Sequence, residues 1–198
     1  MTAENMTADP VTADEVLDFW FGQPRAPQPR AEWFGKDAAF DLGIRQRFGA
    51  TLQAALAGGL RDWDAQPTGA LARILVLDQF TRNAFRDTPG AFAGDALALA
   101  AAQALVAGGG HVGLAPLQRW FAYMPFEHAE DLHAQRQSLQ LFVELAAQHP
   151  DMADAKKWAI KHAEIVERFG RYPHRNAILG RISGEAELAF LSTPGSGF

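Results

Sequence analysis

The chain has 198 residues, of which 48% are hydrophobic and 21% are charged. This length predicts a single domain, residues 1–198, that can bury a large core without disulfide bonds. The formal net charge of -5 argues against a general nucleic-acid surface. The sequence contains no cysteine, which excludes disulfides and thiolate metal sites.

No segment is expected to target or span a membrane. Residues 1–10 lack the basic start and the apolar core of a signal peptide. The most apolar run, residues 96–107, is too short to span a bilayer and contains Gln103. These two observations predict a cytoplasmic protein with no membrane partner.

Helical periodicity begins close to the N-terminus. Thr12 and Glu15 have the spacing of a capping box in front of an apolar run that ends near Gly22. Three prolines within residues 23–30 predict a loop. A helix over residues 37–57 follows, because its apolar residues recur every four positions.

Two helices and an irregular segment are predicted in the middle of the chain. Thr68 is expected to begin a helix, and residues 81–90 are expected to be irregular and polar. Asp95 is expected to cap an alanine-rich helix that ends at the triple glycine, residues 108–110.

The second half of the chain is predicted to contain four further helices. Pro116 fits the first turn of a short helix, and Pro125 is expected to open the longest one. Ser183 is expected to cap the last helix. The predicted ranges are 116–123, 125–148, 152–169 and 183–191.

Helical patterns account for nearly the whole chain, and no alternating run of β-branched residues predicts a strand. The predicted fold is therefore all-α, with antiparallel helix pairs joined by short connections.

Three ionisable residues occupy helix positions where core residues are expected. Asp78, His128 and His162 each continue an apolar stripe on a different helix. A buried charge is unfavourable unless it is paired. We therefore expect these residues to meet one another, or to meet Arg82 and Arg175.

A polar turn follows the helix predicted over residues 152–169. Gly170 is suited to end that helix, and Pro173 restricts the backbone. Convergent donors on a stiff turn suit an anion or a cluster of carboxylates. A structural tie to helix ends and neighbouring acids is the alternative. The polar side chains on this turn are Arg171, His174, Arg175 and Asn176.

Standard catalytic and metal motifs are missing from the sequence. Glu130 and His133 form one E-x-x-H, but a carboxylate-bridged di-metal site needs two. No H-E-x-x-H motif, phosphate loop or nucleophile elbow is present. A mononuclear site from the two core histidines with Asp78 or Asp131 remains open as a minor alternative. The sequence predicts no metal and no cofactor, and the catalytic residues, if any, are unknown.

The motifs together resemble a bacterial family, domain of unknown function nine-twenty-four. The resemblance covers nearly the whole chain and implies an all-helical fold similar to tetratricopeptide-type helical arrays. It implies no established activity. The motifs that carry it are Leu17-Asp-Phe-Trp-Phe-Gly22, Leu77-Asp-Gln-Phe-Thr-Arg-Asn83, Tyr123-Met-Pro-Phe-Glu-His128 with Glu130-Asp131, Arg168 through Asn176, and Pro194-Gly-Ser-Gly-Phe198.

The resemblance also implies a recurrent polar set, without saying whether that set binds, catalyses or holds the fold. The chain departs from the family pattern at Thr81, where proline is usual, at Ala129, where serine is common, and at Gly197. The implied polar set is Asp78, Arg82, Asn83, Glu127, His128, Asp131, His174, Arg175 and Asn176.

Two functions follow as hypotheses, and neither names a reaction or decides whether the protein is an enzyme. The first is a polar pocket for a small anionic ligand, lined by arginine, histidine and aspartate. The alternative is a non-enzymatic helical-repeat scaffold that binds a protein partner, with a purely structural polar cluster. The candidate ligand-binding residues are Asp78, Arg82, Asn83, Glu127, His128, Asp131, His162, Arg171, His174, Arg175 and Asn176.

The C-terminal tail carries a separate expectation. Pro194, Gly195 and Gly197 permit a tight return of the chain. Phe198 is therefore expected to dock on the domain instead of remaining free in solvent.

Overall fold

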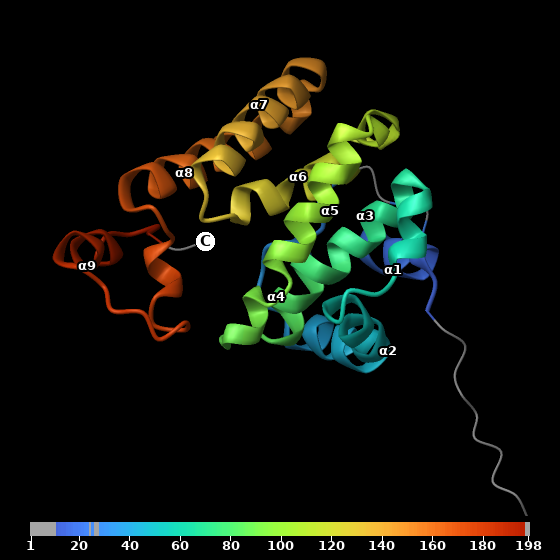
Figure 1. Ribbon diagram of the computed structural model, residues 1–198, viewed down its shortest axis with the longest axis horizontal. Helices are drawn as coiled ribbons and strands as arrows, with labels where there is room; N and C mark the ends of the chain where they lie inside the picture. The colour runs from blue at the N-terminus through green and yellow to red at the C-terminus, as the bar shows by residue number, and fades with distance from the viewer. Residues whose placement is uncertain (1–10, 24, 26–27, 197–198) are drawn as a thin grey trace, which may run out of the picture.

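The structure is a computed structural model that describes residues 11–23, 25 and 28–196. In these ranges every regular element is helical, which confirms the predicted all-α class (Figure 1). The α-helices are α1 (Ala13–Phe21), α2 (Ala38–Leu56), α3 (Pro67–Leu75), α4 (Thr81–Ala84), α5 (Asp95–Ala107), α6 (Pro116–His128), α7 (Leu132–Gln148), α8 (Ala153–Phe169) and α9 (Glu185–Leu191). Short turns lie between them: η1 (Ala31–Trp33), η2 (Arg61–Ala65), η3 (Val76–Phe80), η4 (Pro89–Phe92), η5 (Gly110–Gly113), η6 (Pro150–Met152) and η7 (Pro173–Arg175).

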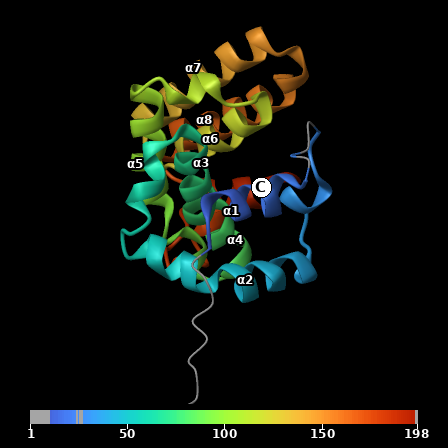
Figure 2. The same ribbon diagram turned by 90° about the vertical axis from the view of Figure 1, so that its right-hand side faces the viewer.

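Helix α3 lies at the centre of the packing. It contacts α1, α5 and α6, while α6, α7 and α8 pack one against the next. Figure 2 shows α2 at one end of the molecule and α7 at the other, with α3 and α6 between them. The short connections between neighbouring helices are compatible with a tetratricopeptide-like array.

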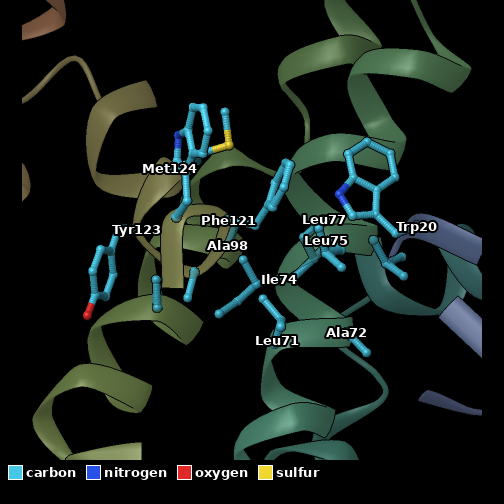
Figure 3. Packing of buried hydrophobic residues seen from close by; sticks show 14 of the residues in the cluster. Trp20, Leu71, Ala72, Ile74, Leu75, Leu77, Ala98, Phe121, Tyr123 and Met124 are labelled. Atoms are coloured by element: carbon cyan, nitrogen blue, oxygen red, sulfur yellow. The ribbon is translucent and has the colours of Figure 1, made fainter. Parts of the chain in front are cut away.

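The sequence of α3 explains its central position. Every residue from Gly69 to Phe80 is buried, as expected for a helix that is surrounded on all sides. Helices α5 and α6 both contact α3. Figure 3 shows Leu71 and Ile74 of α3 beside Ala98 of α5 and Phe121 of α6. An alanine at position 98 allows this close approach.

The helix continues from α3 into a π-helical turn, η3, and then into α4. Thr81 stabilises this join, because its hydroxyl donates to the carbonyl oxygens of Leu77 at 2.8 Å and Asp78 at 3.0 Å. The expectation that residues 81–90 are irregular is therefore wrong at the start of that range. Single π turns inside helices occur frequently at functional sites, and this one carries Asp78.

The boundary between α6 and α7 differs from the prediction. Pro125 lies inside α6 and opens no helix. The break comes at Ala129, whose backbone is extended, and Asp131 then caps α7 by accepting from the Ala134 amide at 2.8 Å. Leu132 and Val143 are exposed on α7.

Two predicted helix caps also have other partners. Gly94, not Asp95, is the N-cap of α5, because the Asp95 carboxylate binds two arginines instead. Gly184 is the N-cap of α9, and the Ser183 hydroxyl accepts from an asparagine side chain. The expected docking of Phe198 lies outside the described residues.

One stretch is apolar enough to cross a membrane by length and composition alone. It covers 19 residues, Pro89–Ala107, and a third of its most apolar window is buried. In the structure it comprises η4 and α5, and α5 packs against α3 and α6. The stretch is thus a helix of the packed array, as found in soluble helical proteins.

Two glycines provide a test of the close packing around η3. A Cβ atom at Gly94 would overlap the carbonyl oxygen of Leu77, whereas Gly49 on α2 has no neighbour within 4 Å of that position. Gly94→Ala should therefore lower the free energy of unfolding by about 1–3 kcal/mol or more. Gly49→Ala should raise it by about 0.5–1 kcal/mol. Urea melts of both variants measure the difference, and equal stabilities would contradict the packing described.

Candidate functional site

The carboxylate of Asp78 is fully buried and accepts hydrogen bonds from three directions. The Gln79 amide donates to it at 2.5 Å, and His128 Nδ1 lies 2.7 Å from its Oδ1. Arg82 Nη1 lies 3.1 Å from the same oxygen. Burial raises the pKa of Asp78, but Arg82 and the hydrogen bonds from His128 and Gln79 outweigh it and lower that pKa. Asp78 is therefore ionised.

A second carboxylate joins two arginines that are distant in the sequence. Asp95, at the start of α5, accepts from Arg82 Nη1 at 2.8 Å and from Arg175 Nη1 at 3.0 Å. The guanidinium of Arg175 lies between the rings of Phe92 and Tyr172, with its Cζ 4.6 Å from each centroid. Both arginines are thereby fixed in place.

Arg82, His128 and Arg175 border a cavity of about 720 Å³. Its walls come from the segment after η1, from η3 and α4, from η4, and from α6, α8 and η7. The volume lies within the range of pockets that hold small molecules. The lining includes Arg82, Asn83, Glu127, His128, His162, His174 and Arg175, all of them in the predicted set.

The three histidines of the cavity are neutral. Burial lowers the pKa of His128, and Arg82 lowers it further. Burial also lowers the pKa of His162 to about 3 and that of His174 to about 4. His128 donates from Nδ1, because its partner is a carboxylate, so its Nε2 is left as a proton acceptor.

Glu127 lines the cavity, and its burial favours the protonated form of its carboxyl group. Its side chain is 1% exposed, and burial together with the charge of Asp78 raises its pKa well above the ordinary value. Its Oε2 lies 3.8 Å from His162 Nδ1, which also lies 2.8 Å from the Trp158 carbonyl oxygen. A carbonyl oxygen can only accept, so His162 Nδ1 carries its hydrogen.

Some donors and acceptors of the cavity are unused. Among the described residues, Arg82 Nη2, Arg175 Nε and Glu127 Oε1 are buried and have no hydrogen-bond partner. A buried polar atom without a partner is unfavourable by about 1–3 kcal/mol. Each such atom needs an explanation, for example a bound water, ion or ligand.

Four residues of the predicted set do not line the cavity: Asp78, and the three whose contacts lie elsewhere, Arg171, Asn176 and Asp131. Arg171 binds Glu187 through two hydrogen bonds, at 2.7 and 2.8 Å. Asn176 donates to Ser183 and Glu187. Asp131 is exposed and caps α7. Arg171 and Asn176 join the chain around η7 to α9, and Asp131 begins α7.

Asp78 and Asn83 each connect the cavity lining to residues outside the lining. Asp78 does not line the cavity but holds two residues that do, Arg82 and His128. Asn83 lines the cavity, and its amide donates to Asp41 at 2.7 Å.

Sequence reasoning missed the aromatic part of the wall and Asp95. Asp95 was interpreted as a helix cap, and nothing in the sequence relates it to Arg175, 80 residues away. The apolar residues of the wall are absent from the predicted site residues. Their spacing of four on α6, between Trp120 and Met124, was the available signal.

The arrangement can bind charge and move a proton. Two fixed guanidinium groups face the cavity beside a carboxylate–histidine pair whose Nε2 can accept a proton. Within the described part of the chain, no three His, Asp or Glu side chains are placed so as to hold a metal ion.

Comparisons with known proteins give a family and a fold, but no activity. The family model of the bacterial protein of unknown function DUF924 matches residues 16–195. The solved structure of ATU0120, a protein of unknown function from Agrobacterium tumefaciens, is similar with a TM-score of 0.81 and 38% identity. The match covers 91% of this chain and 96% of that one. A search of curated proteins finds no match.

The pairing of Asp78 can be tested by comparing two acids of the predicted set. Asp78→Ala leaves His128 and Arg82 buried without their shared partner, and should lower the free energy of unfolding by about 3–5 kcal/mol. Asp131→Ala removes an exposed helix cap and should lower it by about 0.5–2 kcal/mol. Urea melts measure both, and an Asp78→Ala variant that melts like the wild type would exclude a shared buried network.

The protonated state of Glu127 predicts a pH dependence. The unfolded chain loses this proton near the ordinary pKa of 4.5, whereas the folded chain keeps it to a higher pH. The folded state then binds the extra proton, so this group lowers stability as pH rises above that value. Glu127→Gln removes the penalty, and should gain stability over the wild type by up to about 1.4 kcal/mol per pH unit.

Denaturant melts across a pH series provide the measurement. The control is Glu167→Gln, which makes the same chemical change at an exposed position on α8, outside the cavity. If the stability difference between Glu127→Gln and the wild type does not change with pH, the raised pKa of Glu127 is wrong.

Proposed function

The chain belongs to the bacterial family of unknown function DUF924, and we propose that it binds a small anionic molecule in the cavity beside Arg82 and Arg175. The observation that carries this proposal is the pair of unused donors on the two arginines, Arg82 Nη2 and Arg175 Nε. The residues that would contact or support the anion are Arg82, His128 and Arg175, with Asp78 and Asp95 behind them.

Both arginines are already oriented, which favours binding. Asp95 holds one nitrogen of each guanidinium, and Phe92 packs against both. A preorganised donor loses little side-chain entropy when a ligand arrives. Hydrogen bonds between guanidinium groups and an anion are charge-assisted and stronger than neutral ones.

The charges of the site allow one additional negative charge if a proton is taken up. Arg82 and Arg175 are balanced by Asp78 and Asp95 before any ligand binds. An anion would raise the pKa of His128, whose neighbours also include the neutral Glu127 and His162. Binding of the anion and protonation of His128 should therefore favour each other.

The structural alternative has less support. In a cluster that serves only the fold, the buried nitrogens of a guanidinium group are expected to be paired, as Nε and Nη2 of Arg171 are paired with Glu187. Two of the cavity's donors, on Arg82 and Arg175, lack partners among the described residues. This difference between the two networks favours a ligand site.

Small anions at millimolar concentration test the proposal. Formate, acetate, sulfate and phosphate should be compared by thermal shift and titration calorimetry, and at least one should stabilise the wild type. Arg175→Ala should abolish that binding and Arg175→Lys should weaken it. Binding should tighten as pH falls from about 8 to about 6, by at most about tenfold per pH unit.

Arg171→Ala is the matched control, because this arginine lies four residues earlier and binds Glu187 outside the cavity. Its anion affinity should equal that of the wild type. If none of the anions binds, or if Arg171→Ala and Arg175→Ala lose affinity equally, the proposed site is wrong.

A further inference from the structure

The cavity changes from apolar to polar along two of its helices. On α6 the lining residues are first Trp120 and Met124, then Glu127 and His128. On α8 the lining passes from Trp158 to His162. Residues spaced by four lie on one face of a helix, and eight residues rise about 12 Å. The two ends of the cavity therefore have different chemistry.

The apolar end is built from aromatic side chains that are partly exposed. Phe34 stacks on Trp120 with centroids 5.2 Å apart, although Phe34 is 56% exposed. Trp158 is 44% exposed. Large apolar side chains gathered at one opening commonly mark a binding surface. This wall can cover a hydrocarbon or aromatic group.

The segment that carries Phe34 is fixed. The indole of Trp33 donates to the Trp20 carbonyl oxygen at 2.9 Å. Arg30 donates to the carbonyl oxygens of Phe19 at 2.9 Å and Trp20 at 2.8 Å. The end of α1 thus holds this segment against α6, and the aromatic wall belongs to the fold.

The polar end limits the charge of a ligand. The two arginines are matched by Asp78 and Asp95, and the ion pairs at the rim, Arg86 with Asp41 and Lys36 with Asp87, add no net charge. One added negative charge can be balanced by one proton on the carboxylate-bound histidine. A second negative charge would require a proton on His162 or His174, and burial lowers the pKa of His162 to about 3 and that of His174 to about 4.

We infer that the ligand class of this site is an apolar monocarboxylate, with its carboxylate at Arg82 and Arg175 and its hydrocarbon or aryl body against Trp120, Phe34 and Trp158. This inference rests on the proposed function, because it names the ligand class of the same site. The carboxylate oxygens accept hydrogen bonds from Arg82 Nη2 and Arg175 Nε, which have no other partner among the described residues. The apolar body of the ligand packs against the aromatic wall.

A series of straight-chain carboxylates provides the experiment. Acetate, butanoate, hexanoate and octanoate are titrated into the wild type by calorimetry at one pH. Affinity should rise about threefold to fourfold for each added methylene that enters the apolar end. Octanamide, which lacks the charge, should bind at least about tenfold more weakly than octanoate.

Variants at each end of the cavity test separately how much the carboxylate and the hydrocarbon chain of the ligand contribute to affinity. Phe34→Ser and Trp158→Ala should weaken octanoate severalfold and leave acetate unchanged. Ile182→Ser is the control, because Ile182 is 90% exposed and lies outside the cavity. Arg175→Ala should weaken every member of the series.

The outcomes distinguish this inference from the proposed function. If acetate or an inorganic anion binds but octanoate binds no tighter, the apolar monocarboxylate is excluded and the anion site remains. Equal affinity for octanoate and octanamide would likewise overturn the assignment. If neither carboxylates nor inorganic anions bind, the proposed function itself fails.

Discussion

The buried carboxylate of Asp78 is the contact on which the rest of the structure depends. It lies in the π-helical turn between α3 and α4 and receives hydrogen bonds from α4 and from the end of α6. The Asp78 carboxylate therefore joins the central helix, the short α4 and the last turn of α6. A negative charge in the core is unfavourable unless its partners are present together, so this point fixes the mutual positions of three elements.

The polar residues fall into two networks with different degrees of pairing. The network of Glu130, Asn176, Arg181 and Glu187 joins the turn at η7 to α9 and to the segment after α6. Asn176 and Glu187 are buried, Glu130 and Arg181 are half-buried, and these groups are bound to one another. The network around Asp78 and Asp95 borders the cavity, and two of its nitrogens, Arg82 Nη2 and Arg175 Nε, have no hydrogen-bond partner among the described residues. Similar residue types thus serve the fold in one place and a candidate site in the other.

Helix periodicity and charge rules predicted part of this arrangement. Asp78 and His162 could be placed in the core because each lies on the apolar face of its helix. A buried ionisable side chain needs a partner, so contacts with other polar residues could also be expected. Asp131 was assigned to the same cluster by its proximity in sequence, but it caps α7, and that cap also sets the helix boundary that was missed. Asp95 and Phe34 were not found, because their roles depend on contacts between distant segments that no local pattern records.

The contacts of Asp95 with Arg82 and Arg175 affect how the chain can fold during translation. Arg175 lies 80 residues further along the chain than Asp95, and chains are synthesised from the N-terminus at about 5–20 residues per second. During synthesis, α5 exists for several seconds before its partner leaves the ribosome. Contacts of such long range slow folding. The helices of the first half can pack during translation, whereas the cavity closes only after η7 has been synthesised.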